Sequence, residues 1–87
     1  MAYRVEFLTT ATEELAAVPK PEQRRIAAKI DALRDNPRPP GVKKLTGGDK
    51  LYRLGVGSYR VIYSVDGKKL VVLVIRVGHR KDVYRRL

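Results

Sequence analysis

The sequence predicts an α+β fold of order β-α-α-β-β-β, in which a helical hairpin packs on one face of a small, mostly antiparallel sheet. Three observations predict it: residues 51–80 contain three consecutive strand patterns, two amphipathic segments precede them, and an alternating stretch opens the chain. Two helices that are apolar on one side must bury that side against a sheet. The other face of the sheet is then available as a working surface.

The first half of the chain carries the strand and the helices. Residues 3–7 alternate between apolar and polar side chains, which is typical of a half-buried strand. Thr10 and Glu13 have the spacing of a capping box and predict a helix over 11–18. A second helix is predicted over 21–35, because apolar residues recur there at helical spacing and a proline follows. The two helices form a hairpin with one shared apolar side.

The second half carries the sheet. Strands are predicted over 51–56, 59–65 and 69–78, with a brief extended segment over 42–46 before them. The strand over 69–78 is apolar on both faces, so we expect it to be central. Asp66-Gly67 is the strongest hairpin signal in the chain.

The predicted register decides which side chains share a face. A two-residue turn at Asp66-Gly67 pairs Val61 with Val72 and places Arg60 and His79 on the face away from the helices. Arg53 is expected to join them from the neighbouring strand. Arg76 alternates with the residues that share the face of His79, so its side chain points to the other face. We expect it to pair with an acidic residue of a helix or to reach solvent.

Composition limits the classes of function. With 87 residues we expect a single domain over 1–87, and the absence of cysteine excludes disulfides and thiolate metal sites. No apolar run approaches the length of a membrane span, so a cytoplasmic protein without membrane contact is expected. The formal net charge is +10, and the excess lies entirely in residues 37–87. This segregation favours an anionic partner, RNA or DNA, with an acidic protein as the alternative.

The basic residues suit phosphate chemistry. Cleavage of RNA without a metal needs a base for the 2′-hydroxyl, cations for the pentacoordinate phosphorus and an acid for the leaving oxygen. Arginine suits the second role, and His79 suits the first or third. Tyr84 is a weaker acid candidate or a stacking platform, and Lys43 and Lys44 attract phosphate non-specifically. The ordinary alternatives are a polar surface histidine, an ion-paired Arg60 and solvated tail charges. Ligand spacing for a metal is lacking.

Motifs along the whole chain resemble one family. They are the opening YRVEFLTTATEEL, Pro37 after the second helix, Lys44-Leu45-Thr46-Gly47, YRVIY over 59–63 and VGHRKDVY over 77–84. Together they resemble the RelE/ParE toxin superfamily, with its microbial-ribonuclease-like fold, and most of all the RelE-type messenger-RNA interferases.

The resemblance implies a toxin with a cognate RelB-like antitoxin, in a possible heterotetramer, that cleaves mRNA in the ribosomal A site without metal or cofactor. The residues that match the family's catalytic positions are Arg53, Arg60, His79, Arg80 and Tyr84. Contacts to RNA or ribosome are expected from Lys43, Lys44, Lys50, Lys81 and Arg85. Gly55 departs from the pattern, because many relatives have a second cation there, so the general base stays open between His79, Lys50 and Lys44. The alternatives are a ParE-like gyrase inhibitor and a non-catalytic ribosome- or RNA-binding toxin.

Overall fold

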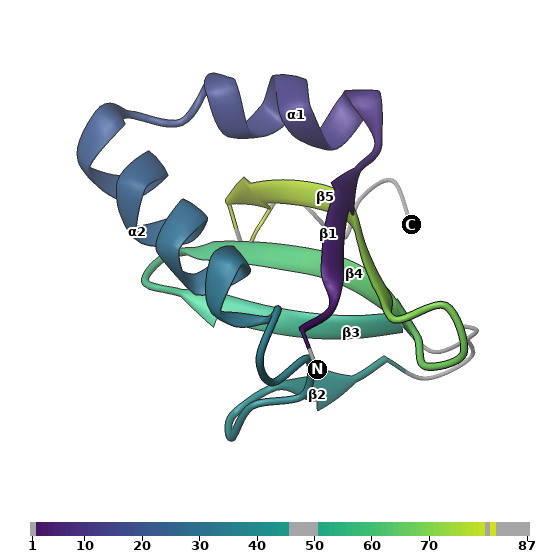
Figure 1. Ribbon diagram of the computed structural model, residues 1–87. Coiled ribbons are helices and arrows are strands. Elements are labelled where there is room, and N and C mark those ends of the chain that lie inside the picture. The colour runs from purple at the N-terminus through teal and green to yellow at the C-terminus, as the bar shows by residue number, and fades with distance from the viewer. Residues whose placement is uncertain (1, 46–50, 80, 82–87) are drawn as a thin grey trace.

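The computed structural model describes residues 2–45, 51–79 and 81. Its elements are, in order, β1 (Arg4–Phe7), α1 (Thr9–Ala16), α2 (Lys20–Ala32), β2 (Lys43–Lys44), β3 (Leu51–Val56), β4 (Tyr59–Asp66) and β5 (Val71–His79). The five strands form one sheet of order β1-β5-β4-β3-β2, in which β1 runs parallel to β5 and the other pairs are antiparallel. Both helices lie on the same side of this sheet (Figure 1), which confirms the predicted α+β architecture.

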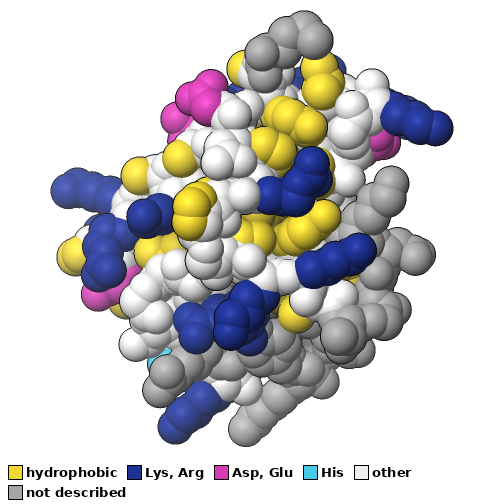
Figure 2. Space-filling view, turned by 90° about the horizontal axis from the view of Figure 1, so that it is seen from below, with side chains coloured by type: hydrophobic (Ala, Val, Ile, Leu, Met, Phe, Trp, Pro, Cys, Tyr) yellow, Lys and Arg dark blue, Asp and Glu magenta, His cyan; other side chains and the backbone are white. Residues whose placement is uncertain are grey.

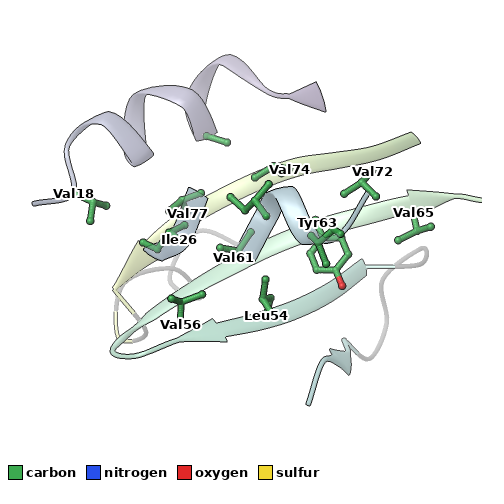
Figure 3. Packing of buried hydrophobic residues seen from close by; sticks show 13 residues of the cluster. Val18, Ile26, Leu54, Val56, Val61, Tyr63, Val65, Val72, Val74 and Val77 are labelled. Carbon is green, nitrogen blue, oxygen red and sulfur yellow. The ribbon is translucent and has the colours of Figure 1, made fainter. Parts of the chain in front are cut away.

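The core fills the space between the helices and the sheet. Apolar side chains from α2 and from one face of β3, β4 and β5 meet there (Figure 3). The central residue is Tyr63, which is fully buried and whose hydroxyl donates a 2.6 Å hydrogen bond to the carbonyl of Pro37. This bond ties the segment after α2 to the middle strand. Alternation along the strands predicted over 51–56 and 59–65 puts every second side chain on one face, and Leu54, Val56, Val61, Tyr63 and Val65 are buried on the helix-facing side.

Helix α1 begins earlier than predicted, and the predicted capping box is wrong. Leu8 is the N-cap and has no side-chain cap, so Thr10 and Glu13 lie inside the helix. The backbone N–H of Leu8 still donates to the carbonyl of Val74 in the sheet. The chain thus passes from β1 into the helix without a linker.

Helix α2 ends at Ala32, three residues before the predicted end. The N–H groups of Leu33 and Arg34 donate to carbonyls three residues back, Ile30 and Asp31. This is the tighter 3₁₀ pattern that commonly closes an α-helix.

The connection between β4 and β5 also differs from the prediction. Asp66 pairs with Val71, so residues 67–70 form a four-residue loop, and Val61 pairs with Val77 instead of Val72. The Asp66 side chain accepts hydrogen bonds from the backbone N–H groups of Lys68 and Lys69, which stabilises this wider turn.

A β-bulge then changes which side chains share a face. Ile62 pairs with Arg76 but its neighbour Tyr63 pairs with Val74, so β5 has one extra residue at this point. An extra residue reverses the alternation beyond it. His79 consequently lies on the helix side of the sheet, opposite Tyr59, and the prediction that it shares a face with Arg60 is wrong.

Candidate RNA-binding and catalytic surface

No helix among the described residues covers the face of the sheet away from α1 and α2. Figure 2 shows this face from below: cationic side chains cross its middle above apolar ones, and acidic side chains lie toward its margins. Ile62 points to this side, because its strand neighbours Val61 and Tyr63 belong to the helix-facing core and Ile62 does not. It is nonetheless 0% exposed. Long basic side chains can cover an apolar residue with their aliphatic stems and keep their charge in water.

The register places Arg53 and Arg60 together on this face. Arg53 pairs with Ile62, and Gly55 pairs with Arg60. Arg53 and Arg60 are therefore diagonal neighbours across two strands, a relation that puts side chains about 7–8 Å apart. Lys43 pairs with Arg53 from β2 and extends the basic row. The prediction that Arg53 and Arg60 share this face is confirmed.

Arg60 is held by the backbone of the β3–β4 turn. Its Nη1 donates to the carbonyl of Tyr59 at 3.1 Å and to that of Gly57 at 3.4 Å. No carboxylate among the described residues forms an ion pair with it. Neutral carbonyl groups therefore position the guanidinium of Arg60, and its charge stays available to an anion. The alternative, that Arg60 is part of an ion pair, has no support in the described part of the chain.

His79 lies on the other side of the same hairpin end. Its ring packs edge-on against Tyr59, with ring centroids 5.8 Å apart. It lines a cavity of about 380 Å³ together with Glu22 and Arg25 of α2. Neither α2 residue was predicted at a site from the sequence.

The hydrogen bonding of His79 indicates its tautomer. Its Nδ1 accepts a 3.3 Å hydrogen bond from the backbone N–H of Lys81. In the neutral ring the proton is then on Nε2, which is a hydrogen-bond donor in this form. To give a proton to a leaving oxygen the ring must first become imidazolium, with both nitrogens protonated.

Arg76 is outside the candidate site. Its Nη2 lies 2.8 Å from Glu14 Oε2 of α1, and its Nε also donates to that carboxylate. The same carboxylate accepts the backbone N–H of Val77 at 2.9 Å. Glu14 therefore joins α1 to β5, and the expectation that Arg76 pairs with a helix acid is confirmed.

The structure places only some of the remaining predicted site residues. Lys44 pairs with Tyr52, a residue of the helix-facing set, so alternation separates it from Lys43. Lys81 is exposed. Four predicted site residues lie outside the described residues: Lys50, Arg80, Tyr84 and Arg85. The sequence also predicts a turn at 47–49 and a final half-turn of helix over 82–87, and both lie outside the described residues.

The described ranges contain neither a cluster of metal-binding side chains nor a membrane-spanning helix. No group of three His, Asp or Glu residues in residues 2–45, 51–79 and 81 could hold a metal ion. No helix in this part of the chain is long and apolar enough to cross a bilayer.

Comparison with known proteins gives a family. Residues 5–84 match the model of the ParE toxin of type II toxin–antitoxin systems. Toxin RelG of Mycobacterium tuberculosis is 37% identical over 99% of this chain and 100% of its own length. The mRNA interferase toxin RelE of Escherichia coli is 32% identical over 97% of this chain and 92% of its own length.

Solved structures agree with this result. The archaeal RelE–RelB complex from Pyrococcus horikoshii matches with a TM-score of 0.82 and 36% identity, over 94% of this chain and 99% of that one. The intact E. coli RelBE toxin–antitoxin complex matches with a TM-score of 0.80 and 30% identity, over 90% of this chain and 96% of that one. The chain therefore belongs to the RelE/ParE superfamily, as a RelE-type toxin of a toxin–antitoxin system.

Proposed function

We propose that this toxin is a ribosome-dependent endoribonuclease that cleaves mRNA in the A site. The observation that carries the proposal is the pair Arg53 and Arg60 on the uncovered face, with the guanidinium of Arg60 positioned by backbone carbonyls. The relative from E. coli that is named an mRNA interferase, at 32% identity, supports it. A ribosomal target implies that the protein acts in the cytoplasm.

The proposed reaction is an internal transfer at phosphorus. The 2′-oxygen forms a bond to the adjacent phosphorus and loses its proton, the bond from phosphorus to the 5′-oxygen breaks, and that oxygen gains a proton. The products are a 2′,3′-cyclic phosphate and a 5′-hydroxyl. Arg60 stabilises the extra negative charge on the phosphoryl oxygens, and a preorganised cation there is worth several kcal/mol. Arg53 binds the same or the adjacent phosphate.

The proton transfers are assigned to residues at the same end of the sheet. His79, in its imidazolium form, acts as the acid for the 5′-oxygen when the RNA passes around the end of the β3–β4 hairpin, and it becomes neutral as it gives up the proton. The proton of the 2′-hydroxyl goes to Lys50 or Lys44, the other two candidates for the general base. Arg80 and Tyr84 are assigned by family resemblance, Arg80 to the phosphate and Tyr84 to base stacking or proton transfer. The phosphate contacts outside the catalytic group are Lys43, Lys44, Lys50, Lys81 and Arg85.

We further propose that a RelB-like antitoxin binds this toxin, in a heterotetramer or a simpler complex. The two neighbours from P. horikoshii and E. coli are toxin–antitoxin complexes. The net charge of +10 favours an acidic partner. The antitoxin shields or distorts the surface around Arg60, and a complex that still cleaves mRNA would contradict this.

A second candidate function is inhibition of DNA gyrase without cleavage. The matching family model is named for ParE, which favours this alternative. A third is binding to the ribosome without chemistry, which the glycine at position 55 favours.

Primer extension on ribosomes that carry a defined message tests these alternatives. Wild type should produce A-site cuts, whereas Arg60→Ala and Arg80→Ala should produce few or none and still bind ribosomes. An inactive wild type that blocks gyrase supercoiling would favour the second function. An inactive wild type that binds ribosomes and spares gyrase would favour the third.

A further inference from the structure

Gly55 and Arg60 face each other directly in the β3–β4 ladder. A Cβ atom at Gly55 would lie 3.1 Å from Nη1 of Arg60, 3.5 Å from its Cζ and 3.8 Å from its Nε. The guanidinium therefore lies across β3 in the space that a side chain at position 55 would fill. Gly55 does not have positive φ, so its backbone conformation does not explain the glycine.

The turn that follows holds the guanidinium in this space. The carbonyls of Gly57 and Tyr59 accept hydrogen bonds from the same Nη1, at 3.4 Å and 3.1 Å. A free arginine side chain has about 2 kcal/mol of rotamer entropy to lose on binding. An arginine that is fixed before it meets its ligand has already lost part of this freedom.

We propose that Gly55 is a positioning residue for Arg60. Its missing side chain lets the guanidinium lie across β3, within reach of the turn carbonyls, so that it presents a fixed pair of donors to a phosphate. For catalysis this inference rests on the proposed nuclease function. The positioning itself does not depend on that function.

The substitution Gly55→Ala separates positioning from folding. A contact of 3.1 Å is too close, but the atom it meets is the end of a flexible side chain, so the guanidinium moves and the backbone stays. Alanine also suits a strand better than glycine, by several tenths of a kcal/mol. The variant should therefore be at least as stable as wild type while Arg60 is displaced.

Gly67→Ala is the matched control. Gly67 lies in the loop after β4, has no positive φ, and its Cβ would meet only the Tyr3 hydroxyl at an ordinary 3.9 Å. Gly57 would be unsuitable, because its φ of +60° strains any other residue and Arg25 lies 3.5 Å from the Cβ position.

The experiment measures single-turnover cleavage on programmed ribosomes for both variants, in the wild-type and the Arg60→Ala backgrounds. We expect Gly55→Ala to lower kcat roughly tenfold, because small displacements of a catalytic group have large effects, and to leave KM within about twofold. It should have no further effect when Arg60 is alanine, and Gly67→Ala should match wild type. A Gly55→Ala variant with wild-type kcat, or an equal loss in both backgrounds, would overturn the inference.

An NMR measurement keeps the inference testable if the nuclease proposal fails. The Arg60 Nε–H signal should shift in Gly55→Ala and stay unchanged in Gly67→Ala. If wild type does not cleave but this shift occurs, the function is wrong and the positioning is right. If the signal does not move, the positioning is wrong whatever the activity.

Discussion

The ion pair between Glu14 and Arg76 provides a strong test of which arginines are structural. The two side chains are 23% and 13% exposed, so water screens them only weakly. Removal of one partner of a buried pair costs about 3–5 kcal/mol, and partial exposure places this pair near the lower end. Glu14→Ala also leaves the backbone N–H of Val77 without its acceptor. We therefore expect Glu14→Ala to lower the free energy of unfolding by about 3 kcal/mol.

That loss is large for a chain of 87 residues. Domains of this size lose roughly 4–8 °C of Tm per kcal/mol, so the melting temperature should fall by about 12–24 °C. Glu14→Gln should lose less, because its amide oxygen still accepts from Val77. A double-mutant cycle with Arg76→Met should give a coupling energy above about 1 kcal/mol. Both quantities come from thermal and urea unfolding followed by circular dichroism.

The activity of Arg76→Met gives the functional half of this test. At a temperature where the variant is folded, it should cleave mRNA at a rate close to that of wild type, because Arg76 is turned toward α1. A coupling energy near zero would refute the assigned structural role. Folded Arg76→Met without activity would place Arg76 in the catalytic site and refute its exclusion.

Two further predictions concern stability at high pH and salt dependence. Tyr63→Phe removes the hydrogen bond to Pro37 and should cost about 1–3 kcal/mol near neutrality, whereas Tyr52→Phe, whose hydroxyl makes no hydrogen bond within the described residues, should cost little. Burial raises the pKa of Tyr63 from 10.0 to about 12, so its contribution is complete below pH 10 and is lost, by about 2.7 kcal/mol in all, as the pH rises through 12. Urea unfolding over this range should show the advantage of wild type over Tyr63→Phe disappear, and a constant difference would contradict the shift. Arg53→Ala should reduce the slope of log K against log salt concentration for single-stranded RNA binding by about 0.7, the value for one phosphate contact. Lys29→Ala, at an exposed position of α2, should leave this slope unchanged. Equal effects of the two substitutions would indicate non-specific attraction.

The fold was predictable because its signals are local and periodic. Alternation over 51–56 and 59–65 correctly assigned the helix-facing side of β3 and β4, including Tyr63. The helix-facing apolar residues of α2 followed from their spacing in the same way. These patterns depend only on which side of an element is buried.

The site was less predictable because it depends on register. Leu73 lies on the face of Arg60 as predicted, but the bulge after it moves His79 to the helix side. The extra residue is Ile75, which is as apolar as most of β5 and so does not mark a bulge in the sequence. The four-residue loop was also missed, because Asp66-Gly67 has the composition of a two-residue turn. Gly55 was interpreted as a missing cation, and only the cross-strand pairing reveals that Arg60 occupies its space.

The rate of A-site cleavage by wild type and by Arg60→Ala, with identification of the product ends, is the most direct test of the central claim. We expect wild type to leave a 2′,3′-cyclic phosphate and a 5′-hydroxyl, and Arg60→Ala to react at least about 100-fold more slowly while it remains folded and bound to the ribosome. Equal rates for the two proteins, or ends that carry a 5′-phosphate, would contradict the assignment of the uncovered face as a site for 2′-hydroxyl attack.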